Sequence, residues 1–161
     1  MIKGYKCFNN DFTNIYGTKF EIGISYSTNG KVEYGTDGNG FHFCKNLEDT
    51  LRYFDAMNED VIIAEVIGSG KILTYDDEYN GYYDTYISEN LLVTRILSHT
   101  EIIEMALNMN FARATRFIQS FRLTNIEQEL FKKTFYNYIN VLRTIDYYQS
   151  DNYKKLIREY K

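Results

Sequence analysis

The distribution of glycine constrains the fold of this chain more than any other feature of its sequence. All ten glycines lie between Gly4 and Gly81, and the chain contains no proline. Residues 82–161 therefore lack both of the residue types that most strongly interrupt helices. In the first half, glycine is typical of the tight turns that join short strands. The sequence thus predicts a strand-rich half followed by a helical half.

Short runs rich in aromatic and β-branched residues predict the strands of the first half. These runs lie at residues 2–8, 19–26, 31–34, 40–44, 61–68, 71–75 and 91–97. Glycine-containing turns are expected between several of them, at residues 28–30, 35–40 and 68–70. A short helix capped by Asn46 is expected as well, because Leu47, Leu51 and Phe54 recur on one helical face.

Capping boxes predict where helices begin in the second half. Ser98 and Glu101 open a helix that runs to about Asn108, and Thr124 with Glu127 opens a long helix over residues 125–149. A helix between them starts near residue 110, and a last helical segment covers 151–161. The inner face expected for the helix near residue 110 consists of Phe111, Ala114, Ile118 and Phe121.

The fold class predicted from these patterns is α+β. Residues 1–97 form a β-rich part, a mainly antiparallel sheet with one short helix, and residues 98–161 form a helical bundle. We expect the two parts to make one compact unit. Their charges differ, because residues 1–97 carry 15 acidic and 8 basic residues while residues 98–161 carry 7 acidic and 10 basic ones.

Composition excludes several classes of protein. The chain of 161 residues is 44% hydrophobic and 25% charged, which is typical of a globular domain. No uncharged apolar run is long enough to cross a membrane, and the N-terminus lacks the apolar segment of a secretion signal. Two cysteines are too few for a disulfide framework, so we expect a cytoplasmic protein. A net charge of −4 argues against a general nucleic-acid binder.

An acidic, tyrosine-rich segment, residues 75–89, is the most unusual feature of the sequence. From Ile72 to Thr94 there is no lysine or arginine. Burying so many unpaired carboxylates would cost several kcal/mol each, so the segment must lie largely at the surface. The candidate contact residues are Tyr75, Asp76, Asp77, Glu78, Tyr79, Tyr82, Tyr83, Asp84 and Tyr86.

Three interpretations of segment 75–89 stay open. It is a solvated hairpin whose tyrosines cover the core, or a surface that binds a basic protein such as a nucleic-acid-binding one, or an active site in which an acid such as Asp84 acts. A calcium site fits poorly, because the spacing of the acids differs from that of an EF-hand loop.

Two histidines and two cysteines are candidates for a metal site or an activated nucleophile. His42 and Cys44 share a face of one predicted strand, and Cys7 and His99 would have to complete a metal site. Their spacing matches no metal-binding pattern, so we expect no metal and a cysteine that fills a gap in the core.

Three motifs carry a resemblance to a known family. GYKCFNNDF, GFHFCKNLEDTLRYF and YDDEYNGYYDTY resemble a domain of unknown function found in Gram-positive bacteria and in their phages and mobile elements, over roughly residues 2–105. That resemblance implies a small accessory or counter-defence protein.

The order of the predicted elements is also similar, more remotely, to that of small ADP-ribosyltransferases. This likeness implies that Tyr5 or Lys6, His42 and Asp84 would lie near an NAD site. Those enzymes hold NAD with a histidine or arginine on the first strand, where this chain has Lys3 and Lys6.

The leading hypothesis is therefore a binding protein without catalysis or cofactor that contacts another protein through segment 75–89. Such a protein would act as a phage-borne inhibitor of a bacterial defence complex, with no direct contact to nucleic acid or membrane. The alternative is an NAD-using transferase around His42 and Asp84, or a protein that sequesters a nucleotide.

Overall fold

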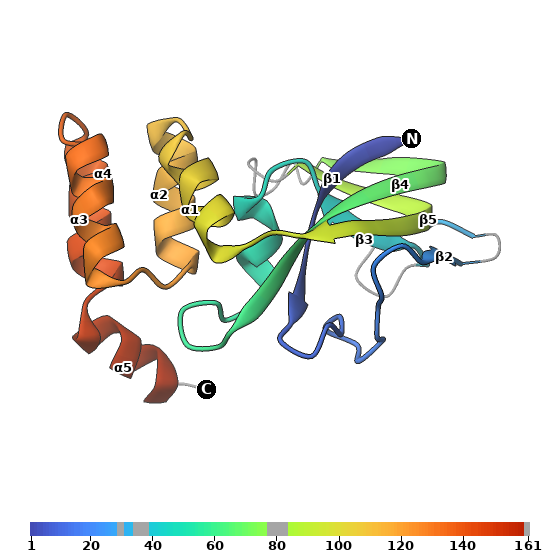
Figure 1. Cartoon of the computed structure of the whole chain (residues 1–161), viewed down its shortest axis with the longest axis horizontal. Coiled ribbons are helices and arrows are strands. Elements are labelled where there is room, and N and C mark those ends of the chain that lie inside the picture. Colours follow the sequence, from blue (N-terminus) through green and yellow to red (C-terminus); the bar gives the residue numbers. More distant parts are fainter. Residues whose placement is uncertain (29–30, 34–38, 77–83, 160–161) are drawn as a thin grey trace. The chain divides into compact units, whose positions relative to one another are not determined.

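The computed structural model of the chain describes residues 1–28, 31–33, 39–76 and 84–159. It divides into two compact units, a strand unit (residues 1–54 and 61–97) and a helical unit (residues 55–60 and 98–161). The N-terminal antiparallel sheet and the C-terminal helices confirm the α+β class (Figure 1). No helix among the described residues is long and apolar enough to cross a membrane.

Five antiparallel strands form the sheet of the strand unit. They are β1 (Ile2–Asn9), β2 (Ser25–Ser27), β3 (Phe41–Cys44), β4 (Val61–Asp76) and β5 (Asp84–Ile96). Their order is β2-β5-β3-β1-β4, and β4 pairs with β5 as well. Strands β1, β3, β5 and β4 therefore form a closed ring, in which β1 and β3 pair at Tyr5 and Cys44.

The interior of this ring follows from the alternation of side chains along the strands. Phe8 on β1 is fully buried, and the ring of Phe20 lies 5.2 Å from it. The buried core residues are Phe8, Phe20, Phe43, Ala64, Val66, Leu91 and Val93. Gly4 lies where β1 and β3 meet, and a Cβ atom there would be 2.4 Å from the main-chain oxygen of Cys44. Only glycine allows the two strands to approach this closely.

The structure corrects two of the predicted strands. Residues 19–24 do not form a strand, because Gly23 has a φ of 80° and interrupts the extended run, and Phe20 turns into the core. Residues 31–33 also lie outside any strand, although Val32 is buried. The proposed turns at 28–30 and 35–40 lie mainly outside the described residues.

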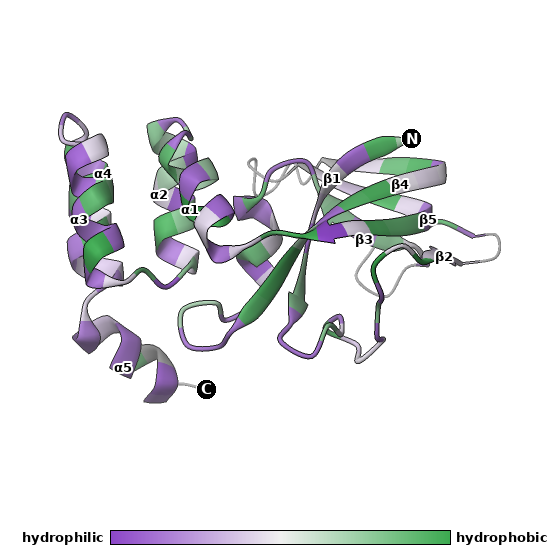
Figure 2. Cartoon of the chain, in the orientation of Figure 1, coloured by the Kyte–Doolittle hydropathy of each residue, from purple (hydrophilic) through white to green (hydrophobic). Residues whose placement is uncertain are grey.

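Residues 68–70 are not a link between two strands. Strand β4 continues through them, and Figure 2 shows it green, and so apolar, along much of its length. Gly70 has a φ of 75°, and the register with β5 shifts between Ser69 and Ile72. Gly70 therefore belongs to a β-bulge inside one long strand, a feature that sharpens the local twist.

The short predicted helix is a 3-10 helix, η1 (Glu48–Tyr53). Leu47 and Leu51 are buried as predicted, and η1 contacts β1 and β3. Asn46 does not cap it, because its side-chain amide donates to Asp49 and Leu47 occupies the N-cap position.

Five helices are described in the helical unit. They are α1 (His99–Leu107), α2 (Phe111–Ser120), α3 (Asn125–Thr134), α4 (Ile139–Tyr148) and α5 (Asp151–Glu159). The capping boxes at Ser98 and Thr124 are confirmed. Phe111 is 47% exposed, contrary to its predicted inner position, and stacks on Tyr138 with their ring centroids 5.2 Å apart.

The predicted long helix over residues 125–149 is wrong, because the chain turns between α3 and α4. Phe135 ends α3 with non-helical dihedral angles, and the amide of Tyr138 donates to its carbonyl oxygen at 2.8 Å. A straight helix of this length would extend about 37 Å. Two shorter helices instead bury Phe131, Val141 and Ile145 within one unit.

Gln149, at the end of α4, links this helix by hydrogen bonds to the C-terminal end of α2. Its buried amide nitrogen donates to the carbonyl oxygens of Ile118 (2.6 Å) and Phe121 (2.9 Å), and its oxygen accepts from the amide of Leu123 (3.0 Å). These contacts satisfy main-chain groups where α2 ends, which would otherwise be buried without partners.

Candidate functional site

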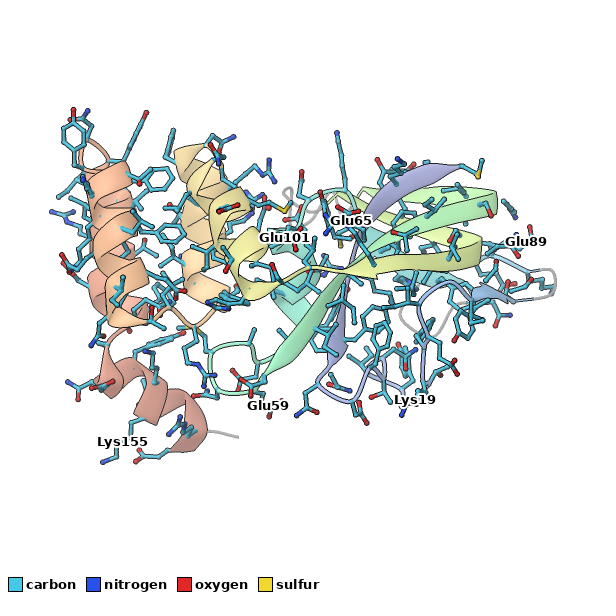
Figure 3. The ribbon with its side chains drawn as sticks, in the orientation of Figure 1. Lys19, Glu59, Glu65, Glu89, Glu101 and Lys155 are labelled. Carbon is cyan, nitrogen blue, oxygen red and sulfur yellow. The ribbon has the colours of Figure 1, made fainter. Side chains whose placement is uncertain are left out.

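Segment 75–89 lies only in part within the described residues. Residues 77–83 lie outside the described part of the chain, and for Asp76 and Asp84 only the strand pairing is described, in which they lie opposite each other. Tyr86 is described and packs in the core, with its ring centroid 5.3 Å from that of Phe43. The carboxylate of Glu89, labelled in Figure 3, accepts the main-chain amide of Lys71 at 3.1 Å.

A pocket lies in the strand unit beside β1 and β3, next to the Tyr5–Cys44 pair at which these two strands meet. Its volume is about 170 Å³. The connection between β1 and β2 forms one wall, β3 forms another, and residues at the end of η1 complete it. Figure 3 shows the side chains of this connection, with Lys19 labelled. The lining residues are Lys6, Cys7, Asn14, Ile15, Tyr16, Thr18, Gly40, Phe41, His42, Tyr53 and Phe54.

Hydrogen bonds within the chain hold the wall formed by the β1–β2 connection. The side-chain oxygen of Asn14 accepts the main-chain amides of Tyr16 (3.0 Å) and Thr18 (2.9 Å). The side-chain amide of Asn9 donates to the main-chain oxygen of Asn14 at 3.2 Å. Ile15, at the tip of this turn, is 49% exposed and borders the pocket. The side chains of Asn9 and Asn14 therefore fix the main chain of this wall before any ligand binds.

Lys6 is the charged residue of the pocket. Its Nζ donates to the main-chain oxygen of His42 at 2.6 Å and lies 5.8 Å from the centroid of the Phe8 ring. Among the described residues, Lys6 forms no ion pair with a carboxylate. Burial lowers the pKa of Lys6 from 10.5 to about 8, because an ammonium loses its hydration there, and the neighbouring Cys44 and Cys7 oppose this only in part.

The two cysteines are buried, unreactive thiols. Burial raises the pKa of Cys7 to about 12 and that of Cys44 to about 11. Both side chains are at most 5% exposed, and the sulfur of Cys44 lies 3.8 Å from Oγ1 of Thr85. A thiol with a raised pKa is a poor nucleophile and a poor metal ligand at neutral pH.

No group of three or more histidine, cysteine, aspartate or glutamate side chains that could hold a metal occurs in the described ranges. His99 belongs to the helical unit, where its Nε2 lies 2.6 Å from the carboxylate of Glu127. Glu127 also accepts the amide of Thr124 within the capping box, and these bonds lower the pKa of Glu127 against the opposing effect of burial.

Of the residues that the transferase likeness singles out, Lys6 and His42 line the same pocket. Tyr5 points to a different hollow, on the side of β1 that carries Lys3. His42 pairs with Ile87, which is three residues from Asp84 along β5, or about 10 Å at the usual rise of a strand. The side chain of Asp84 lies outside the described part.

That second hollow has a volume of about 470 Å³ and lies over β1, β4 and β5. Basic side chains of Lys3, Lys45 and Arg95 line it together with Glu65, which is labelled in Figure 3. The guanidinium of Arg95 donates two hydrogen bonds to the Glu65 carboxylate, at 2.9 and 2.8 Å. This pair fixes both side chains to the sheet.

Sequence reasoning did not assign the pocket at Lys6, although the alternation along β1 contains a signal for it. Residues Ile2, Gly4, Lys6 and Phe8 share one face of the strand. A lysine on a face that is otherwise apolar must either reach solvent or be placed for a purpose. The walls of the pocket come from residues far apart in the sequence, so no local pattern could have shown them.

A family model described as a domain of unknown function (DUF7666) matches residues 2–103. The match spans every described strand and η1, and it ends within α1. No curated protein and no solved structure matches the chain significantly.

Proposed function

The chain belongs to the DUF7666 family, and we propose that its strand unit is a non-catalytic binding module that holds one small ring-bearing molecule in the pocket at Lys6. The observation that carries this proposal is a largely apolar pocket that encloses a lysine with no carboxylate partner among the described residues. Pockets of this kind, apolar with a few polar groups, are typical of small-molecule sites.

The size of the pocket limits its ligand. An apolar cavity of about 150 Å³ inside a protein binds benzene. The volume of about 170 Å³ therefore suits one aromatic ring with a small substituent, and not a dinucleotide such as NAD. Phe41, Tyr53 and Phe54 supply aromatic surface for such a ring.

The charge of the pocket selects the substituent. Lys6 already donates one hydrogen bond to His42, and an ammonium has two further N–H groups to satisfy. An oxygen acceptor on the ligand would satisfy one of them. The ligand class that fits best is a ring carrying a carbonyl or carboxylate oxygen.

The test is a ligand-observed NMR titration with benzoate, benzaldehyde and benzyl alcohol. We expect benzoate and benzaldehyde to bind more tightly than the alcohol. Ile15→Trp should fill the pocket and abolish binding, whereas Ile22→Trp, at an equally exposed isoleucine of the same connection that does not line the pocket, should leave it unchanged. Equal binding to both variants, or none to the native protein, rejects the proposal.

We also propose a second function, in which segment 75–89 contacts a basic, nucleic-acid-binding protein complex of a bacterial host. The supporting observation is the register of β4 and β5, which brings Asp76 opposite Asp84 where the strands leave the described region. Like charges directly opposite on neighbouring strands are destabilising, so a basic partner would be favourable there. Inhibition of a defence complex by a phage-borne protein is the biological form of this proposal.

A charge reversal tests this second function. Replacing Asp76, Asp77 and Glu78 by lysine should abolish capture of the partner from host lysate while leaving the melting temperature nearly unchanged. The matched control reverses three exposed acids outside the segment, Glu21, Glu59 and Glu104, and should retain capture. Capture by the triple variant at the native level would eliminate this surface.

A further inference from the structure

Building on the proposed ligand pocket, we infer that Lys6 holds its ligand covalently, by condensing with the carbonyl group of a ring-sized aldehyde to form an imine. The proposal narrows the ligand class from any ring with an oxygen acceptor to one with a reactive carbonyl. It also makes Lys6 a modification site that differs from every other lysine of the chain.

The hydrogen bond of Lys6 suits an amine nucleophile. The main-chain oxygen of His42 accepts an N–H of Lys6 at 2.6 Å and cannot itself supply a proton. A neutral amine keeps this bond and retains one lone pair for attack. Carboxylates would instead favour the ammonium, and none pairs with Lys6 in the described part of the chain.

The protonation of Lys6 supports this role. Burial lowers the pKa of Lys6 to about 8. Roughly a fifth of the side chains are therefore neutral at pH 7.4, against about 0.1% for an ordinary lysine. Reactive lysines that form imines are activated by burial in this way.

Other nucleophiles of the pocket do not compete. Cys7 lines the same pocket, but burial raises the pKa of its thiol to about 12, so the reactive thiolate is scarce. Lys6 is thus the more available nucleophile of the two at neutral pH, and it carries the primary amine that imine formation requires.

The reaction balances without an oxidant or a reductant. The nitrogen of Lys6 attacks the carbonyl carbon, the π electron pair of the carbonyl moves to its oxygen, and one proton of the nitrogen passes to that oxygen. The carbinolamine that results loses its hydroxyl and the remaining proton of the nitrogen as water. The products are one imine and one water from one amine and one aldehyde, and hydrolysis reverses the step.

The experiment traps the imine with benzaldehyde and sodium cyanoborohydride at pH 7.4 and measures the modification of each lysine by peptide mass spectrometry. Neutral fraction alone favours Lys6 about 250-fold over an exposed lysine. The lower basicity of its amine also makes it a weaker nucleophile. With the Brønsted coefficient of about 0.4–0.5 known for thiols, this reduces the advantage of Lys6 roughly 10- to 18-fold. We expect Lys6 to react about 14- to 25-fold faster than Lys3, which lies exposed on the same strand.

The pH dependence gives an independent readout. The rate at Lys6 should follow the neutral fraction of its amine, which falls as the pH is lowered below about 8. Ile15→Trp should reduce the rate at Lys6 to that of Lys3 or below, and Ile22→Trp should not. Lys6→Arg should remove the adduct on the peptide that carries residue 6 and leave the other lysines as they were.

Failure of the imine and failure of the pocket give different results. If Lys6 reacts no faster than Lys3 while NMR shows benzaldehyde bound and displaced by Ile15→Trp, the covalent inference is wrong and the proposed pocket stands. Absence of both fast labelling and NMR binding overturns both. Fast labelling of Lys6 that Ile15→Trp does not change also overturns the inference, because the reaction then does not depend on the pocket.

Discussion

Replacing Lys6 with methionine should stabilise the protein at neutral pH. Methionine keeps the length of the side chain and removes the charge. The native pKa of about 8, against 10.5 for a lysine in water, means that burying the ammonium costs about 3 kcal/mol. Loss of the hydrogen bond to the His42 oxygen lowers the stability of the variant by about 1 kcal/mol. We therefore expect Lys6→Met to raise the free energy of unfolding by about 2 kcal/mol at pH 7.

The pH dependence of this gain identifies its cause. Below pH 8, Lys6 is charged in both the folded and the unfolded protein, so folding carries the full cost. Between pH 8 and 10.5 the folded protein loses this proton first, so the unfolded state binds more protons and the stability of the native protein rises with pH. The advantage of Lys6→Met should fall by about 2.5 kcal/mol between pH 7 and pH 10.

Urea denaturation at pH 7 and pH 10 measures both quantities. Lys3→Met is the matched control, because it removes the same charge from an exposed position on β1. Titration of other groups cancels when variant and native protein are compared at one pH. If Lys6→Met is less stable than the native protein at pH 7, or if its advantage is the same at pH 10, then the ammonium is not buried at a cost and the reasoning on the pocket is refuted.

Three further predictions concern buried residues within the strand unit and within the helical unit. Gly4→Ala should lower the free energy of unfolding, measured by urea denaturation, by about 3 kcal/mol, because the new Cβ would clash with the main-chain oxygen of Cys44. A decrease of less than about 0.5 kcal/mol would contradict the close approach of the two strands. Gln149→Leu should cost about 3–5 kcal/mol, since three main-chain groups lose their partner, and an unchanged melting curve would show that water replaces it. At pH 8, iodoacetamide should alkylate Cys7 and Cys44 at least about 100-fold more slowly in the native protein than in urea, because burial raises the pKa of both thiols; comparable rates in a mass-spectrometric time course would mean that they are accessible.

Sequence reasoning succeeded where the determinants of structure are local. The side chains of Ser98 and Thr124 cap their own helices within four residues, so the starts of α1 and α3 could be predicted to the residue. Fold class followed from composition for the same reason, since glycine and proline act on the backbone where they stand.

Prediction from sequence failed where contacts with residues distant in the sequence determine the local structure. Residues 19–24 have the composition of a strand, but Gly23 donates its amide to Val93 and Phe20 is drawn into the core. The helix predicted over 125–149 keeps its apolar period, yet α4 packs on α2, and that contact requires a turn after Phe135. Periodicity reports which face of a segment is apolar, and not whether the segment is continuous.

The candidate site shows the same limit. His42 and Lys6 were singled out by a likeness in the order of elements, but the pocket that unites them exists because β1 and β3, separated by more than thirty residues, meet at one end. Nothing in the sequence around Ile15 indicated that it would border this pocket.

The assignment of residues 55–60 to the helical unit has a consequence for how such a protein could arise or be divided. The chain passes between the two units three times, after residues 54, 60 and 97. Ala56 and Met57 are buried, and the carbonyl oxygen of Ala56 accepts the amide of Arg122 at 3.1 Å. A deletion of the helices after residue 97 would therefore leave residues 55–60 between η1 and β4 with apolar side chains that no helix covers. We therefore expect a relative that lacks the helices to carry polar residues at the positions of Ala56 and Met57.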